Sequence, residues 1–197
     1  MIIHSNMSNS SKTLHLILIT LTTFLHTTPT TSSHHHHNHH DRHHNLKSLH
    51  FTLYQHDQIN KTDFLIVPSP LGTTITETTS PFGTIGLIND PLTLTKDPNS
   101  EMIGNVESIA ITSSFDGLDS LSIGRIKLEL EDHKGSVSVV GVVNAVVSSD
   151  YPVVGGTGDF LFVQGYVTAS PVSFEKGGRY VYKQEFHLFW PPYALHA

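Results

Sequence analysis

From Leu49 onward, apolar and polar residues alternate in short runs, and this period-two pattern is the strongest constraint on the fold. In the first run, the apolar positions are Leu49, Phe51 and Leu53. Successive side chains of a strand point to opposite faces, so such alternation is typical of a half-buried β-strand. Seven similar runs follow, at Phe64–Val67, Gly83–Ile88, Val106–Phe115, Leu121–Leu130, Val137–Val143, Phe160–Ala169 and Arg179–Trp190.

Turn signals separate these runs, among them Asn89-Asp90-Pro91, Asp116-Gly117 and Lys176-Gly177-Gly178. Short connectors and an almost complete lack of helical periodicity indicate antiparallel strands. Composition alone leaves a β-sandwich open, but both faces of the long run Arg179–Trp190 carry mixed residues, which favours a barrel. We therefore predict an all-β fold, an eight-stranded antiparallel β-barrel whose lumen can hold a small ligand.

The chain divides into three parts. Residues 1–33 carry Lys12 followed by the apolar run Leu14–Leu25, which predicts a secretory signal peptide; a buried strand is the alternative. That run is too short to span a bilayer, so we predict a secreted, extracellular protein of the apoplast with no membrane span. Residues 34–48 form a His-rich linker, and residues 49–197 form the barrel domain.

The linker contains eight of the sixteen histidines, between His34 and His44. Neutral imidazoles are good ligands for divalent transition metals. The tract has no defined ligand spacing, however, and it precedes the folded domain. We predict a solvated, pH-sensitive linker and no specific metal site.

Composition excludes several classes of function. The chain has no cysteine, so disulfides, thiol catalysis and cysteine metal sites are ruled out. It carries 17 acidic against 11 basic residues and no basic stripe, which argues against a nucleic-acid partner. The glycine-rich run Gly155–Gly158 lacks the lysine and the downstream helix of a phosphate-binding loop. No cofactor is therefore expected.

The run from Pro152 to Tyr166, with three glycines in four residues before Asp159, resembles a motif of the plant dirigent family. The resemblance extends over nearly the whole domain, through motifs in the family's order at residues 51–57, 81–84, 89–93, 102–104, 116–118 and 133–136. It implies an eight-stranded barrel, a homo-oligomer (a trimer or a dimer) of such barrels, and a small phenolic substrate. It also implies that acids at Asp57 and Asp159 act on that substrate.

Asp57 ends the first predicted strand, and Asp159 opens the seventh. A carboxylic acid whose pKa is raised by an apolar lumen can protonate a departing hydroxyl, and an ionised one can accept a phenolic proton. A turn cap is the alternative role for Asp57, and a local turn hydrogen bond is the alternative for Asp159.

Two features point to a subgroup. Lignan-directing members carry an arginine before the glycine of the seventh strand, where this chain has Gln164. They also carry tyrosines in a region where this chain has Ala110 and Thr112. The segments 162–168 and 185–194 instead look like those of the legume pterocarpan synthases. This resemblance implies an isoflavonoid substrate and a hydro-lyase reaction, in which a hydroxyisoflavanol is dehydrated and ring-closed through a quinone methide.

Two alternatives stay open. The chain is a non-catalytic guide for stereoselective coupling of phenoxy radicals supplied by a separate oxidase, or it is a defence-related binding barrel without chemistry. Further substrate-binding candidates are Gln164, Tyr166, Arg125 and Tyr180, with a surface ion pair as the alternative for Arg125 and core packing for the tyrosines. Asn60 heads an Asn-Lys-Thr glycosylation sequon beside a turn.

Overall fold

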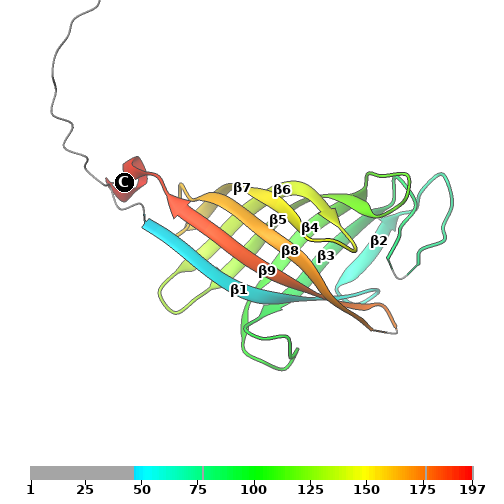
Figure 1. Cartoon of the computed structure of the whole chain (residues 1–197), viewed down its shortest axis with the longest axis horizontal. Helices are drawn as coiled ribbons and strands as arrows, with labels where there is room; N and C mark the ends of the chain where they lie inside the picture. The colour runs from blue at the N-terminus through cyan, green and yellow to red at the C-terminus, as the bar shows by residue number, and fades with distance from the viewer. Residues whose placement is uncertain (1–46, 77, 176, 197) are drawn as a thin grey trace, which may run out of the picture. The chain divides into compact units, whose positions relative to one another are not determined.

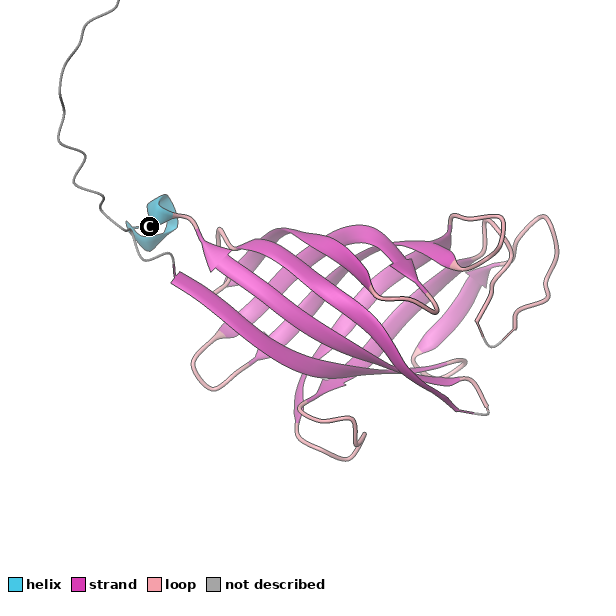
Figure 2. Cartoon of the chain, viewed as in Figure 1, coloured by secondary structure: helices cyan, strands magenta, loops and turns pink. Residues whose placement is uncertain are grey.

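The computed structural model describes residues 47–76, 78–175 and 177–196, so the predicted signal peptide and nearly all of the His-rich linker lie outside the described residues. The described chain forms a single antiparallel sheet that curls into a barrel (Figure 1). Its strands are β1 (Lys47–Gln58), β2 (Asp63–Val67), β3 (Ile85–Thr93), β4 (Met102–Thr112), β5 (Asp119–Glu129), β6 (Lys134–Asn144), β7 (Ser149–Gly158), β8 (Gln164–Glu175) and β9 (Arg179–Trp190). A short 3-10 helix, η2 (Pro192–His196), follows β9 (Figure 2).

The sheet has the order β1-β9-β8-β7-β6-β5-β4-β3-β2, and a further pairing of β1 with β3 closes it. In this pairing Tyr54 lies opposite Thr93, and Gln55 lies opposite Leu92. Closure through β1 and β3 makes a cylinder of eight strands. The additional strand β2 pairs with the first residues of β3, from Ile85 to Ile88. The predicted eight-stranded antiparallel barrel is confirmed.

Strand β9 shows how the alternation builds the wall. Phe186 and Leu188 are fully buried and point inward, together with Tyr180, Tyr182 and Gln184 on the same face. The intervening residue Phe189 is exposed and points outward. The structure therefore decides which of the two mixed faces of this strand meets the lumen.

Large side chains fill one end of the lumen. Phe160 and Trp190 stack there with ring centroids 6.2 Å apart, above the buried Phe186 and Leu188. At the opposite end, inward positions of β4 and β5 carry small residues such as Ala110 and Ser122. The core therefore closes one end of the barrel and leaves a cavity at the other.

The predicted strand Phe160–Ala169 is corrected at its start. The glycine-rich run lies inside β7, where Gly156 pairs with Val137 of β6, and residues 159–163 form the turn that leads into β8. A Cβ on Gly156 would lie 2.2 Å from the carbonyl oxygen of Phe160, so glycine lets the turn fold back against the strand. The turn begins at Gly158, whose φ of 61° suits glycine.

Candidate functional site

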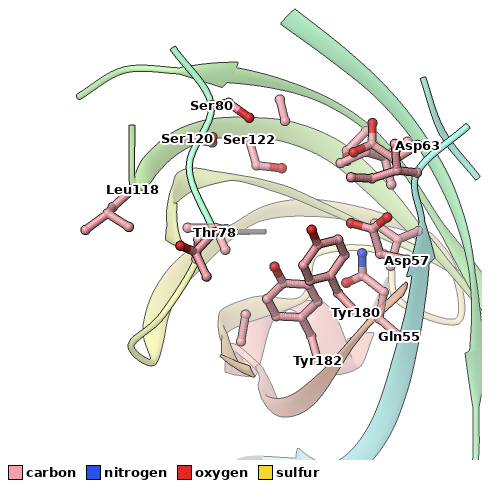
Figure 3. Close-up of a pocket in the computed structure, with 18 of the residues that line it drawn as sticks. Gln55, Asp57, Asp63, Thr78, Ser80, Leu118, Ser120, Ser122, Tyr180 and Tyr182 are labelled. Carbon is pink, nitrogen blue, oxygen red and sulfur yellow. The ribbon is translucent and has the colours of Figure 1, made fainter. Parts of the chain in front are cut away.

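The open end of the barrel contains a cavity of about 180 Å³ between β1, β4, β5 and β9. A cavity of roughly 150 Å³ holds one benzene molecule, so this one can enclose a single aromatic ring while the rest of a larger ligand extends toward the mouth. The connection between β2 and β3 contributes Thr78 and Ser80 to the rim, as Figure 3 shows. Among the described residues, no lysine, arginine or histidine lines the cavity.

Asp57 lies on the inward face of β1 and lines this cavity with its side chain largely buried. Burial raises the pKa of Asp57 to about 9, and the neighbouring Asp90 and Asp63 add to the shift. One of its oxygens, Oδ1, is buried without a hydrogen-bond partner. The carboxyl of Asp57 is therefore held in its neutral form and can donate a proton into the cavity.

Asp90 of β3 is a second buried acid next to Asp57. Because Gln55 lies opposite Leu92, the antiparallel register continued by two residues brings Asp57 opposite Asp90. Asp90 is fully buried, and its Oδ2 accepts a hydrogen bond of 2.6 Å from the Gln55 amide. Burial raises the pKa of Asp90 to about 7, while the hydrogen bond from Gln55 opposes the rise. The two carboxyls titrate as a pair.

Three buried side chains support Asp90 in a continuous line. The Tyr151 hydroxyl donates to Gln184 Oε1 over 2.6 Å, and Gln184 Nε2 donates to Gln55 Oε1 over 2.5 Å. Gln55 then donates to Asp90, so every hydrogen bond of the line points the same way. Burial also raises the pKa of the Tyr151 phenol, which keeps it protonated as a donor.

The remaining polar groups spread over the cavity wall. The hydroxyls of Tyr180 and Tyr182 point into the space that separates Asp57 from Ser122 (Figure 3). Burial, followed by the nearby Asp57, raises the pKa of Tyr182, so its phenol stays neutral. Asp63 lines the same cavity, and burial raises its pKa as well. The site thus offers the neutral acid of Asp57 and the hydroxyls of the cavity wall to a ligand.

The structure brings Asp57 and Tyr180 to this cavity, but it does not bring Asp159 there. Asp159 is exposed in the turn after β7, where its Oδ2 accepts a hydrogen bond of 2.7 Å from the Lys134 amide. This placement corrects the prediction that Asp159 shares acid and base roles with Asp57. The cause is the turn at 159–163, which replaces the expected strand and carries Asp159 to the outside.

Gln164 and Tyr166 lie on the outward face of β8 and line a separate outer pocket, so the structure does not bring these substrate-binding candidates to the barrel cavity. Gln164 contacts the Tyr193 hydroxyl at 3.4 Å, and Tyr166 stacks on His187 with ring centroids 4.6 Å apart. Their inward neighbour Val167 is fully buried, and the alternation of the strand therefore places both of them outside.

Arg125 is likewise on the outer wall. It forms an ion pair with Glu107 of the adjacent strand, which also contacts Lys127, and these contacts lower the pKa of Glu107 to about 2. This is the surface ion pair that the sequence left open as the alternative. Asn60 is exposed in the turn between β1 and β2.

Asp90, Gln55, Gln184 and Tyr151 were missed by the sequence analysis. Asp90 was assigned to a turn because it stands between Asn89 and Pro91. Asp90 stands two residues before the apolar Leu92, and this spacing could have indicated that both point to the same face of one strand, β3. Within the described residues, no group of three or more His, Asp or Glu side chains is placed to hold a metal ion, and no helix is long and apolar enough to cross a membrane.

Comparisons with known proteins give matches in both sequence and fold. A family model described as "Dirigent-like protein" matches residues 48–189. "Pterocarpan synthase 1" of Glycine max is 30% identical over 156 residues, which cover 75% of this chain and 80% of that protein. "Dirigent protein 5" of Arabidopsis thaliana is 28% identical over 109 residues, covering 55% and 60% of the two chains.

A solved pterocarpan synthase dirigent protein superposes with a TM-score of 0.66 at 23% identity, covering 74% of this chain and 91% of that one. At this level of identity, the solved structure supports the fold alone.

Proposed function

Since the chain belongs to the dirigent family, we propose that it controls the stereochemistry of a phenolic intermediate by dehydrating and ring-closing a hydroxyisoflavanol. The observation that carries this proposal is Asp57, a neutral buried acid in a cavity that no described cation lines. The similarity to pterocarpan synthases in curated relatives supports the substrate class. Ala110, a small residue on the inward face of β4, leaves room for the substrate.

The reaction takes one proton from Asp57 and returns a different one to it. Asp57 protonates the benzylic hydroxyl of the substrate, the carbon–oxygen bond breaks, and water leaves. The resulting cation is the protonated form of a quinone methide, which the negative charge of the pair can stabilise. A phenol oxygen of the same molecule then attacks the benzylic carbon, and its proton returns to the Asp57 carboxylate.

The cavity also explains how a single product hand is selected. An enclosed ring is held in one orientation, so the internal phenol meets only one face of the planar cation. In this proposal, the substrate phenols bind to the hydroxyls of Tyr180 and Tyr182, which line the cavity. The enzyme contributes a proton and an orientation, without a covalent intermediate.

The test incubates the purified protein with a chiral hydroxyisoflavanol and no oxidase, and resolves the products by chiral chromatography. We expect one enantiomer of the ring-closed product, with a loss of at least about 100-fold in Asp57→Asn. The matched control is Asp159→Asn, which removes an acid outside the cavity and should retain the rate. A wild-type rate equal to the spontaneous one contradicts the proposal.

The same preparation distinguishes the non-catalytic alternative. With an oxidase and a monolignol, an optically enriched dimer identifies a radical-coupling guide, and its formation should not depend on the proton of Asp57. If neither substrate gives optically enriched product, the binding barrel without chemistry is favoured.

We also propose that the barrel assembles with further copies of itself through an outer-face belt. This belt is a continuous apolar surface over β2 to β6. One cross-strand row consists of Phe64, Leu87, Ile109, Ile123 and Val140, and the next consists of Val67, Ile85, Ile111, Leu121 and Val142. Phe64, Leu87 and Ile123 remain between 44% and 51% exposed in the single chain, which is costly for an isolated apolar patch.

Light scattering measures the assembly directly. We expect an oligomer for the wild type and a monomer for Ile123→Lys, which puts a charge in the middle of the belt. Arg125→Ala, at the polar rim beside the belt, is the matched control and should leave the mass unchanged. A monomeric wild type contradicts this part of the proposal.

The exposed turn of Asn60 supports a glycan at this position in a secreted protein. If glycosidase treatment lowers the mass of the wild type but not that of Asn60→Asp, both secretion and modification are verified. An unmodified mature protein would contradict them.

A further inference from the structure

We infer that Asp90 is a positioning residue: the line from Tyr151 through Gln184 and Gln55 keeps Asp90 as the hydrogen-bond acceptor and leaves the proton of the acid pair on Asp57, facing the cavity. The inference rests on the proposed function only in giving that proton a use. Gln55 and Asp90 lie within the family motifs at residues 51–57 and 89–93, but neither they nor Gln184 and Tyr151 were among the candidate site residues.

The direction of the hydrogen bonds in this line shows that Asp90 is the acceptor. A carboxylate only accepts hydrogen bonds, and the Gln55 amide donates to Asp90 Oδ2 over 2.6 Å. An amide that donates at one end offers its oxygen at the other, and Gln55 Oε1 accepts from Gln184 at 2.5 Å. Tyr151 starts the line as a hydroxyl donor. The reversed line would require Asp90 to be protonated and to donate to Gln55.

The groups around Asp57 and Asp90 favour one retained proton on this pair of acids. Asp57 and Asp90 lie on adjacent strands, and the groups that face them are Asp63 from β2, Tyr180 and Tyr182 from β9, and Gln55 from β1. None of these is a cation. His56 points to the other face of β1, where it bonds to Thr93 Oγ1, and Arg179 pairs with Glu175. Two close carboxyls without a cation cannot both ionise readily, so the pair retains a proton at neutral pH.

The hydrogen-bond donors then decide which acid retains the proton. Asp90 Oδ2 accepts a hydrogen bond from Gln55, which stabilises the charged form of Asp90, while its Oδ1 is buried without a partner. The Oδ1 of Asp57 is buried without a partner as well, and within the described chain no hydrogen bond opposes the rise in the pKa of Asp57 as the Gln55 bond does for Asp90. The negative charge is therefore better accommodated on Asp90. Asp57, which lines the cavity, keeps the proton that the substrate needs.

The experiment follows the carboxyl carbons of Asp57 and Asp90 by carbon-13 NMR during a pH titration of the full chain without substrate. In the wild type we expect Asp90 to account for most of the lower step and Asp57 for most of the upper one. In Asp90→Asn, the Asp57 carbon should titrate in a single step at least about 1 pH unit lower, since its negative neighbour is gone. Asp132→Asn, at an exposed turn, should change neither step.

Tyr151→Phe is the second variant, because it keeps both acids and removes only the first donor of the line. We expect the two steps to move closer together, as the preference for charge on Asp90 weakens. An upper step that belongs to Asp90 in the wild type overturns the inference, as does an Asp57 titration that is unaffected by Asp90→Asn.

A second readout uses the ring-closing rate as a function of pH. Asp90→Asn should move the alkaline limb of kcat to lower pH, whereas a merely structural defect would lower the rate at every pH without moving the limb. Because the NMR titration needs no substrate, it can succeed even if the hydroxyisoflavanol is not turned over. Failure of the inference and failure of the proposed function are therefore distinguishable.

Discussion

Gln55 and Asp90 are joined side chain to side chain, 2.6 Å apart, beside the two backbone pairs through which β1 and β3 close the barrel. The pairing of β1 with β3 that closes the barrel therefore also brings the Gln55 side chain to Asp90. A change that loosens the β1–β3 closure is expected to alter the chemistry of the site as well as the stability of the fold.

Asp57→Asn should flatten the dependence of stability on pH. The folded pKa of Asp57 lies near 9, far above the unfolded value of 3.8, so its contribution is complete below pH 4 and is lost as pH rises toward 9. From pH 5 to pH 8 the free energy of unfolding of the wild type should fall by about 2–4 kcal/mol relative to that of the variant. The slope that a single proton gives is about 1.4 kcal/mol per pH unit. Thermal or urea unfolding at several pH values measures this difference. Parallel curves for the two proteins would contradict a neutral buried Asp57.

His56→Gln should remove an instability at acidic pH. His56 is buried, its Nε2 bonds to Thr93 Oγ1 over 2.7 Å, and burial followed by Arg179 lowers its pKa below 6.5. The stability that comes from this neutral imidazole is therefore present above pH 6.5 and is lost as pH falls through the lowered folded value. Glutamine can still donate to Thr93 but does not titrate. Wild type and variant should have similar slopes above pH 7 and diverge below pH 6.5, which urea unfolding can detect.

Substitutions of Asp159 should affect stability and leave the chemistry intact. Asp159→Ala removes the acceptor for the Lys134 amide and should cost about 1 kcal/mol, whereas Asp159→Asn keeps an acceptor oxygen and should cost less. Product yield and enantiomeric excess should match the wild type in both variants. A loss of turnover in the asparagine variant, with normal unfolding, would return Asp159 to the list of catalytic candidates.

Ala110→Phe should close the cavity. The new ring enters a space of about 180 Å³ from the inward face of β4 and occupies the position proposed for the substrate ring. We expect at least a tenfold loss of ligand affinity, measured by calorimetry, with the barrel retained by circular dichroism. Arg125→Phe adds the same ring to the outward face of β5 and should bind ligand normally. Equal losses in both variants would place the binding site elsewhere.

The repeated alternation predicted the barrel because each strand must bury one face, and this requirement is visible within a few residues of sequence. It failed at β7, since the glycines of residues 155–158 carry no side chains to alternate and have the composition of a turn. The error moved the predicted strand start to Phe160 and put Asp159 at the cavity. The same alternation correctly placed Asp57, which follows Leu53 and Gln55 on one face of β1.

Sequence alone determined the antiparallel barrel and the presence of one acid at the end of β1. Tertiary structure decided which acid is its partner. Asp57 and Asp90 are brought together by the register of two strands that close the barrel across the chain, and Gln55 and Gln184 meet over a separation of 129 residues. Local patterns set the direction in which each side chain points, but only the closed register sets the groups that it meets.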